Sequence, residues 1–458
     1  MKERGERVIA FLRKLFPELF RETICWTREW GTSEPTGERV VPVHIENRMK
    51  KQATAIAKKE GVAVVLILTA LLLPSATLAG NHADFAESVA ALVDSGSVML
   101  NTENSRAVFS YNADSRLIPA SIIKILSSLV AIDQLSKEYR FSTEFYVDDR
   151  KNLLIRGLGD PFLISEEIAK IAELLKRRGL NRINRILLDD SAFERNIGIP
   201  GASNTLNPYD ALNGALVINF NTLHLGRDAT GRVFSAERET PLTPLAVRKG
   251  RLIPAGRSER ISLADDANES LQYAGELFRV FLQSRGIMLT TPDIGRGKVS
   301  PQWSLYYIHR NGRTLEEMLT GLLKYSNNFI ANQIFLAIGA LRHGYPANLE
   351  KARRVFRSAI RQEFGTDSGE LYFDEASGLS RHNAITGKMM MRVLESFRPY
   401  SHLLTERDGV LIKSGSLLGV YNYAGYIETK RGLRPFVIML NQARNNRDKI
   451  LDVLKRMP

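Results

Sequence analysis

Three short motifs carry side chains that together could form a serine nucleophile and its activating base. Ser121 and Lys124 lie three residues apart in the run Ala-Ser-Ile-Ile-Lys. Far downstream, Ser326 and Asn328 lie in the run Ser-Asn-Asn, and Lys413 begins the run Lys-Ser-Gly-Ser. In this order the motifs supply a nucleophile, a polar relay and a cation. This set is typical of a serine acyl-transferase that uses lysine, not histidine, as its base.

The chemistry predicts a separate role for each of these side chains. A serine hydroxyl must lose its proton to attack, and a lysine can take that proton near neutral pH only if burial or nearby positive charge lowers its pKa. Lys124 lies on an apolar helix face, and Lys413 supplies the nearby positive charge. We expect Ser326 to relay the proton to the leaving amine. We expect Asn328 to hydrogen-bond both the substrate amide and Lys124.

The run that begins at Lys413 predicts a strand edge that receives the substrate. Lys413 and Ser414 supply a cation and a hydroxyl that can hold a substrate carboxylate. Gly415 lacks the side chain that would block a peptide laid alongside the strand. The backbone N–H groups of Ser121 and Ser416 are candidates for the oxyanion hole, the donors that stabilise the charge developing on the attacked carbonyl.

Other chemistries find less support in the sequence. A Ser-x-x-Lys run is expected about once by chance in a chain of this length, but Ser121 heads the only instance and Lys413 heads the only Lys-Ser/Thr-Gly. The seven histidines form no His-x-x-x-His or His-Glu pair, and there is no Gly-x-Ser-x-Gly run. We therefore expect neither a metal ion nor another cofactor.

Secondary-structure signals place these motifs on suitable elements. Pro119 precedes an apolar helix predicted over 122–135, so Ser121 lies at the N-terminal end of that helix with the lysine one turn further on. Near the C-terminus, residues 419–428 and 433–441 have the pattern of paired strands. The nucleophile is thus predicted on a helix and the cation on a strand.

The remaining chain predicts a catalytic domain that is interrupted by an insert. Helical periodicity is present over 269–285 and over 315–340. Between the first and second motifs the sequence pattern changes and predicts strands, glycine-rich turns and one amphipathic helix. We predict a catalytic domain formed by 80–145 and 266–458, and a mixed, β-rich insert at 146–265.

The N-terminal segment has the pattern of an export signal. Residues 49–79 begin with Met-Lys-Lys, continue with an apolar core at 61–73 and end in small residues. A membrane-spanning helix usually needs about 20 apolar residues, so we expect cleavage after Ala79, with an uncleaved membrane anchor as the alternative. Residues 1–48 are predicted to be an over-extended start. They hold the only cysteine, Cys25, so the exported part would rely on its core and not on disulfides.

The charge balance predicts an anionic partner. The formal net charge is +13 at pH 7, which favours an anionic cell-wall polymer or a lipid surface, and hence peripheral membrane or cell-wall association. Nucleic acid is the other common partner of a basic chain, but we find no zinc-ligand spacing and no basic stripe interleaved with aromatics. The basic cluster at 176–178 ends an amphipathic helix and is interpreted as a solvated face. We expect no nucleic-acid partner.

Beyond these motifs, the sequence resembles the penicillin-recognising serine enzymes, and most closely the class C low-molecular-mass penicillin-binding proteins, the D-alanyl-D-alanine carboxypeptidase/endopeptidase family. The similarity extends from about residue 85 to the C-terminus. The long gap between Ser121 and Ser326 fits, because this class carries an insert there that related β-lactamases lack. Longer blocks that resemble the family lie at 157–161, 188–193, 207–221, 377–383 and 413–422.

The resemblance implies both a fold and a reaction. The fold is α/β (α+β), a transpeptidase/β-lactamase-like domain with an antiparallel sheet flanked by helices. The enzyme would be periplasmic, would acylate Ser121 with the penultimate D-alanine of a peptidoglycan peptide, and would release the terminal D-alanine or cut D-alanyl cross-links. β-Lactams would trap the same acyl-enzyme. Asp189 matches a family position that contacts the diaminopimelate end of the substrate, and Arg381 matches another substrate-contacting position.

Two departures from the family pattern and two rival functions accompany this resemblance. Ser414 stands where the family usually has threonine, which keeps the hydroxyl, and Leu418 stands where some members have a polar residue.

A β-lactamase is one rival function, but the long insert has no evident role in cleaving a small lactam. A catalytically idle peptidoglycan-binding scaffold or penicillin sensor is the other, and the intact side chains of the three motifs argue against it.

Overall fold

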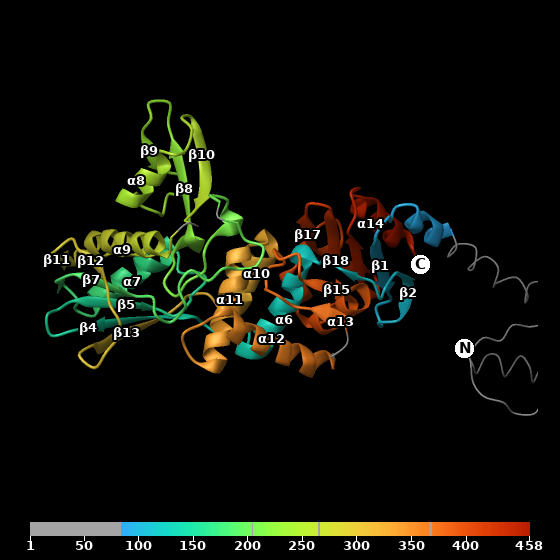
Figure 1. Ribbon diagram of the computed structural model, residues 1–458, viewed down its shortest axis with the longest axis horizontal. Helices are drawn as coiled ribbons and strands as arrows, with labels where there is room; N and C mark the ends of the chain where they lie inside the picture. The colour runs from blue at the N-terminus through green and yellow to red at the C-terminus, as the bar shows by residue number, and fades with distance from the viewer. Residues whose placement is uncertain (1–83, 204, 264–265, 366–368) are drawn as a thin grey trace, which may run out of the picture. The chain divides into compact units, whose positions relative to one another are not determined.

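The computed structural model describes residues 84–458 except for short gaps at 204, 264–265 and 366–368 (Figure 1). The predicted over-extended start at 1–48 and the predicted signal or anchor at 49–79 lie outside the described residues. Among the helices of the described part, none combines the length and the apolarity that crossing a membrane requires.

A six-stranded antiparallel sheet in the order β16-β17-β18-β19-β1-β2 forms the first part of the fold. Its strands are β1 (Gly96–Asn101), β2 (Ala107–Tyr111), β16 (Thr405–Glu406), β17 (Val410–Leu417), β18 (Val420–Thr429) and β19 (Gly432–Leu440). The paired strands expected over 419–428 and 433–441 are β18 and β19. The strand predicted at Lys413 is β17.

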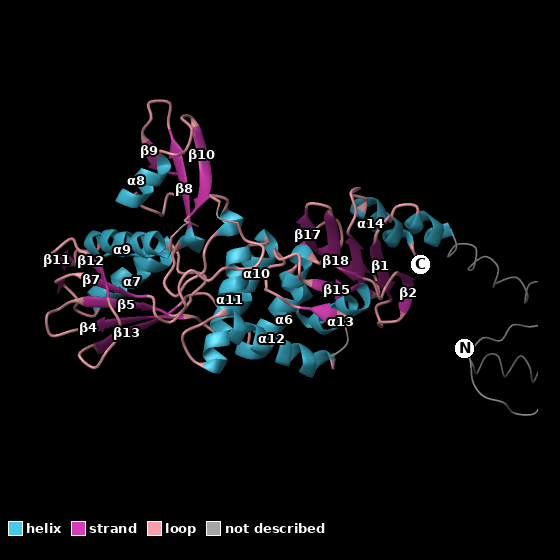
Figure 2. Cartoon of the chain, in the orientation of Figure 1, coloured by secondary structure: helices cyan, strands magenta, loops and turns pink. Residues whose placement is uncertain are grey.

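Helices cover both faces of this sheet (Figure 2). Alternate residues of β19 point to opposite sides: Val437 packs in the apolar core that includes α6 and α13, whereas Ile438 packs in the core that includes α14. This alternation is the normal period of a strand. The helices of this part are α6 (Ile123–Leu135), α10 (Leu315–Tyr325), α11 (Asn328–His343), α12 (Leu349–Phe364), α13 (Gly387–Phe397) and α14 (Arg447–Arg456), with the 3-10 turns η1 (Ala120–Ile122) and η4 (Arg398–Leu403).

Two predicted helices have different outcomes. The apolar helix expected over 122–135 is α6, and most of its residues are buried, as expected of a helix that is apolar all round. The prediction of a single helix over 315–340 is wrong, because the chain forms two helices there, α10 and α11. Ser326 interrupts it with a left-handed φ of 54°, and the side chain of Asn327 then caps α11 by accepting a hydrogen bond of 3.0 Å from the N–H of Ile330.

A second, five-stranded sheet in the order β12-β7-β5-β4-β13 has its own apolar core with α7 (Ser165–Arg177) and α9 (Ala267–Ser284). Its strands are β4 (Ser142–Val147), β5 (Leu153–Gly157), β7 (Ile186–Asp189), β12 (Ile294–Arg296) and β13 (Ser304–Arg310). The sheet is mixed, since β5, β7 and β12 are parallel and β4 is antiparallel to both of its neighbours. The predicted insert limits are 146 and 265. Strand β4 begins before the first limit, and β12 and β13 lie after the second, and those limits stay a prediction.

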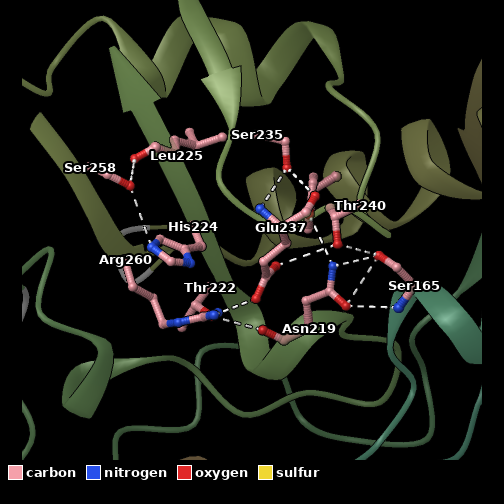
Figure 3. Close-up of polar contacts among 11 residues, drawn as sticks. Ser165, Asn219, Thr222, His224, Leu225, Ser235, Glu237, Thr240, Ser258 and Arg260 are labelled. Carbon is pink, nitrogen blue, oxygen red and sulfur yellow. Dashed lines mark hydrogen bonds and ion pairs between the residues drawn. The ribbon is translucent and has the colours of Figure 1, made fainter. Parts of the chain in front are cut away.

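A small lobe of β8 (Thr222–Arg227), β9 (Val233–Ser235), β10 (Arg257–Ser262) and α8 (Pro244–Gly250) is joined to α7 by a polar network (Figure 3). Arg260 forms an ion pair with Glu237. Asn219 Nδ2 donates to Ser165 Oγ over 2.9 Å, and Ser165 Oγ lies 2.8 Å from Thr240 Oγ1. These bonds satisfy polar atoms at the base of the lobe and fix it to the start of α7.

Short elements complete the described fold. A three-stranded sheet lies beside η1, and a two-stranded parallel pair lies at the edge of the insert. These elements are β3 (Arg116–Leu117), β6 (Arg182–Ile183), β11 (Met288–Leu289), β14 (Leu371–Tyr372) and β15 (Ala384–Thr386), with the 3-10 turns η2 (Pro208–Asp210) and η3 (Asn219–Asn221). The predicted α/β (α+β) class, an antiparallel sheet flanked by helices together with a mixed, β-rich insert, is confirmed.

Candidate active site

Ser121 lies in η1, where distant segments closely enclose the backbone. Ala120 has a φ of 47°, a left-handed conformation that is uncommon for a residue with a side chain and recurs at functional sites. A Cβ added to Gly415 would lie 2.7 Å from the backbone oxygen of Pro119. A Cβ added to Gly378 would lie 1.9 Å from the backbone oxygen of Ala120. Only glycine allows the two segments to approach the serine this closely.

Lys124 is fully buried beside Ser121. Its Nζ lies 2.9 Å from Ser121 Oγ and 2.9 Å from Asn328 Oδ1. The backbone oxygen of Ser377 lies 2.5 Å from the same Nζ. A neutral amine has two N–H donors and one lone pair, so it can donate to Asn328 and Ser377 while it accepts the proton of Ser121 Oγ. The three contacts therefore suit a lysine that acts as a base.

The surroundings of Lys124 favour its neutral form. Burial lowers the pKa of Lys124 well below its ordinary value, the charge of Lys413 lowers it further, and the carboxylate of Glu375 raises it. Burial also lowers the pKa of Lys413, to about 8. Near neutral pH, Lys413 is therefore largely charged while Lys124 can accept a proton.

The break between α10 and α11 presents the second motif to the first and third. Ser326 ends α10 and Asn328 begins α11. Lys413 Nζ lies 2.9 Å from Ser326 Oγ and donates to the backbone oxygen of Ser414 over 2.8 Å. Asn328 contacts Lys124, as described above. The five side chains of the three motifs thus form two hydrogen-bonded groups: Lys124 with Ser121 and Asn328, and Lys413 with Ser326. Lys413 lies near enough to Lys124 for its charge to act on the pKa of that lysine.

Strand β17 presents alternate residues to different surroundings. Lys413 and Gly415 are buried, and Gly415 faces η1, whereas Ser414 and Ser416 are exposed. Strand β16 pairs with β17 only as far as Ile412, so beyond this point no strand of the described chain covers the outer edge of β17. An uncovered strand edge can receive an extended peptide by adding it as a further strand.

Arg381 lies on the rim of this region and not beside the nucleophile. Its guanidinium donates to the backbone oxygen of Leu418, whose side chain is 90% exposed at the turn after β17. Both residues line two open clefts of about 570 and 580 Å³. Pro200 and Gly201 of the insert complete the wall of the smaller cleft. The insert therefore contributes to the rim of the candidate site.

Asp189 is not brought into contact with the other predicted site residues. It ends β7 and has no exposed surface. Its carboxylate accepts hydrogen bonds of 2.9 Å from the backbone N–H groups of Ser191 and Val299. Both partners belong to the five-stranded part of the molecule, and a substrate contact for Asp189 stays a prediction.

Sequence reasoning missed the residues that support the base. Glu375 is fully buried and accepts hydrogen bonds from the N–H and the Oγ of Ser377, at 2.7 and 2.6 Å. Asn332 and Asn383 each donate to the same carboxylate over 2.9 Å. This network fixes the Ser377 carbonyl that contacts Lys124. The available signal was a glutamate two residues before the Ser-Gly-Leu-Ser block, whereas a backbone carbonyl leaves no mark in the sequence.

The assembled groups can perform acyl transfer to a hydroxyl. They supply a nucleophile with its base in hydrogen-bond contact, and a cation beside a free strand edge. Within the described stretches of the chain, no group of three or more His, Cys, Asp or Glu side chains is arranged to hold a metal ion.

Comparison with protein families gives one match that spans both parts of the molecule. The model of the D-Ala-D-Ala carboxypeptidase 3 (S13) family matches residues 83–233 and 245–406. The first range includes Ser121 and Lys124, and the second includes Ser326. The match ends before β17, so the third motif rests on the chain's own residues and geometry.

Two relatives are similar over most of their length. The D-alanyl-D-alanine carboxypeptidase DacB of Haemophilus influenzae is 26% identical over 415 residues, which cover 76% of this chain and 85% of the relative. A D-alanyl-D-alanine carboxypeptidase of an Actinomadura species is 24% identical over 420 residues, which cover 76% of this chain and 77% of the relative.

Solved structures share the fold. The crystal structure of penicillin binding protein 4 of Haemophilus influenzae superposes with a TM-score of 0.64 at 20% identity, covering 81% of this chain and 97% of that chain. The same protein complexed with a β-lactam gives a TM-score of 0.60 at 21% identity with the same coverage. At this level of identity the likeness concerns the arrangement of helices and strands.

Proposed function

This chain belongs to the D-Ala-D-Ala carboxypeptidase 3 (S13) family and is a serine D,D-peptidase of the class C low-molecular-mass penicillin-binding proteins, and we propose that it works through an acyl-enzyme on Ser121. The substrate in this proposal is a peptidoglycan peptide that ends in D-alanyl-D-alanine, or a D-alanyl cross-link between two such peptides. The observation that carries the proposal is the fully buried amine of Lys124, 2.9 Å from Ser121 Oγ.

The first step transfers a proton and forms an ester. Lys124 Nζ accepts the Ser121 hydroxyl proton while Oγ attacks the carbonyl carbon of the penultimate D-alanine. The backbone N–H groups of Ser121 and Ser416 stabilise the negative charge on the carbonyl oxygen, where losing one such donor typically costs about 10²–10³ in rate. The carbon–nitrogen bond then breaks, and the proton reaches the leaving amine from Lys124 by way of Ser326.

The second step returns the enzyme to its starting state. Water attacks the ester carbonyl, gives up its proton to Lys124, and releases the shortened peptide with a free carboxylate while Ser121 regains its hydrogen. A positioned base of this kind contributes on the order of 10²–10⁴-fold. β-Lactams would enter the first step and stall before the second, because the opened ring stays attached to the serine.

We assign the strand edge to substrate binding. In this proposal Lys413 and Ser414 hold the carboxylate of the substrate, and the peptide lies along the uncovered edge of β17. Arg381 would contact the substrate at the rim, where Leu418 offers an apolar side chain. The proposed location is the periplasm, supported by the export pattern at 49–79 and by the similarity to D-alanyl-D-alanine carboxypeptidases.

Product analysis tests the proposed activity. The purified protein is incubated with a synthetic pentapeptide ending in D-alanyl-D-alanine and, separately, with a D-alanyl cross-linked peptide dimer. We expect free D-alanine from the first or monomers from the second, and neither product from Ser121→Ala. Products that persist at the wild-type rate in Ser121→Ala would reject the assignment of the nucleophile.

A further inference from the structure

Arg447, the first residue of α14, reaches the end of β17. Helix α14 packs on β18 and β19 (Figure 1), and from there Arg447 Nη1 donates to Ser416 Oγ over 2.8 Å. The guanidinium also lies over the ring of Tyr423, 4.4 Å from its centroid. The Tyr423 hydroxyl is held in turn by Asp448 Oδ1 over 3.0 Å. The aromatic ring and the serine together fix the orientation of the cation.

No carboxylate of the described residues neutralises this cation. Arg447 forms no ion pair within the described residues, 84–458 with their gaps, and its Nε is buried without a hydrogen-bond partner. The neighbouring Arg444 differs, because its guanidinium pairs with Asp94 at 2.5 Å. An oriented positive charge near the exposed end of β17, with no carboxylate paired to it among the described residues, favours an anion from outside the protein.

The contact also determines what Ser416 can do. A hydroxyl has one donor and two acceptor sites, and a guanidinium can only donate. Arg447 therefore occupies an acceptor site of Ser416 Oγ and leaves the hydroxyl proton free for another acceptor. Because the donor is charged, it also polarises the hydroxyl and strengthens the bond that this proton makes. Ser416 is exposed on the uncovered part of β17, as is Ser414 two residues before it.

We propose that Arg447 is a positioning residue for the carboxylate of the substrate: it orients the Ser416 hydroxyl as a donor to that carboxylate and adds positive charge behind it. The inference rests on the proposed function and extends it to a residue outside the three motifs. Recognition of the terminal carboxylate then depends on a strand and on the C-terminal helix, not on the strand alone.

A pair of substrates isolates this role. Cleavage of a peptide ending in D-alanyl-D-alanine is compared with cleavage of the same peptide bearing a C-terminal carboxamide, which lacks the negative charge. Arg447→Ala is expected to lower kcat/KM for the carboxylate peptide by roughly ten- to a hundredfold, mainly by raising KM, and to have a much smaller effect on the amide. The ratio of the two values does not depend on how much of the variant is folded.

Two further variants define the pathway of the effect. Arg444→Ala removes a neighbouring exposed arginine and should leave the ratio unchanged. In a Ser416→Ala background, Arg447→Ala should lose most of its effect, because the residue through which it acts is absent.

The outcomes separate the inference from the proposed function. Equal losses on both peptides, with a reactive wild-type protein, would overturn the role of Arg447 alone. A wild-type protein that cleaves neither peptide would overturn the proposed function and this role together. A selective loss on the carboxylate peptide that is absent in Arg444→Ala supports the role.

Discussion

Two buried lysines of the candidate active site differ in how strongly their surroundings lower the pKa. Lys124 is the more deeply buried and has Lys413 as a neighbouring cation, so its proton is easily lost. Lys413 has a pKa of about 8 and keeps its proton near neutral pH. One lysine can therefore act as a base while the other supplies charge, although the two side chains have the same chemistry in water.

The rate of acylation should follow this difference. The rate should rise with pH as Lys124 loses its proton, well below the ordinary pKa of lysine, and should fall above about pH 8 as Lys413 loses its charge. The measurement is the second-order rate of benzylpenicillin acylation between pH 5 and 10. A rate that still rises through pH 10 would mean that Lys124 is not the depressed base.

Removing the charge of Lys413 should shift the rising limb of the pH–rate profile. Because Lys413 lowers the pKa of Lys124, Lys413→Met should shift the rising limb to higher pH and remove the falling limb. The overall rate should also drop, since the variant lacks the cation that we propose holds the substrate carboxylate. A rising limb that stays in place in Lys413→Met would contradict the coupling between the two lysines.

The side-chain amide of Asn328 should affect the rate of acylation through its contact with Lys124. Asn328→Ala removes the 2.9 Å contact with Lys124 Nζ and the proposed hydrogen bond to the substrate amide, and should slow acylation by roughly ten- to a hundredfold. The matched control is Asn181→Ala, an exposed asparagine in the insert whose side chain bonds only locally. Similar rates in the two variants would argue against a role for Asn328.

At the level of residues, the sequence predicted the side chains that the structure brings together but not the groups that hold them in place. The five motif side chains could be found because chemistry restricts their types and spacing. The carbonyl of Ser377 could not be found, because every residue has a carbonyl, and its partner Glu375 acquires meaning only when the fold buries it. The assignments of Asp189 and Arg381 came from resemblance and stay predictions.

At the level of elements, a loop between α12 and α13 delivers the carbonyl that faces the base. Glu375 collects donors from its own loop and from Asn332 of α11, so the loop is tied to the helix that carries Asn328. The sequence predicted α6, β18 and β19 well, because their apolar patterns are continuous. It missed the break at Ser326, because helical periodicity continues across a single left-handed residue.

Replacing the central acceptor of this loop should weaken both stability and acylation. Glu375→Gln puts an amide donor where the carboxylate accepts from Ser377 and Asn383, and should lower the free energy of unfolding by roughly 2–4 kcal/mol. Thermal unfolding checks the stability, and benzylpenicillin acylation checks the position of the Ser377 carbonyl. An unchanged melting temperature would show that the loop is held by other contacts.

The close approach of β17 to η1 should tolerate no side chain. Gly415→Ala would place a Cβ 2.7 Å from Pro119 O and 2.9 Å from Ser121 N, so the strand or the nucleophile must shift. We expect a loss of acylation of at least about a hundredfold, consistent with displacement of an oxyanion donor. Gly198→Ala is the control, because nothing lies within 4 Å of its added Cβ. Equal activity in both variants would contradict the described packing.

At the level of the whole molecule, a buried polar cluster joins the two sheet-containing parts. The chain enters the five-stranded sheet through β4 and leaves it through β13. Phe141 directly precedes β4 and Asn311 directly follows β13, and the Asn311 N–H donates to the backbone oxygen of Phe141 over 2.8 Å. The side chain of Asn311 donates to Asp160 Oδ2 over 2.8 Å. The sequence indicated that an insert exists but not which strands form its sheet. The pairing of β4 with β13 could not be predicted, because a long stretch of chain separates the two strands.

This cluster should make stability depend on pH. Burial raises the pKa of Asp160 to about 6, although hydrogen bonds from Asn311 and Phe162 lower it. The folded protein thus binds this proton more tightly than the unfolded chain. The stabilisation is complete below about pH 4 and is lost as pH rises through about 6, by roughly 3 kcal/mol.

Asp160→Asn should remove that dependence. Urea unfolding of the wild-type protein and the variant at pH 4.5 and 7 measures the difference in free energy of unfolding. The wild-type protein should lose stability relative to the variant as the pH rises. Parallel changes in both proteins would show that Asp160 does not hold a proton in the folded state.

The central claim, that Ser121 is acylated, is tested most directly by the intact mass of the protein after exposure to benzylpenicillin. We predict a persistent adduct with the mass of one benzylpenicillin molecule on the wild-type protein and none on Ser121→Ala. An adduct that remains on Ser121→Ala, or a wild-type protein that leaves the drug intact and carries no adduct, would contradict the account.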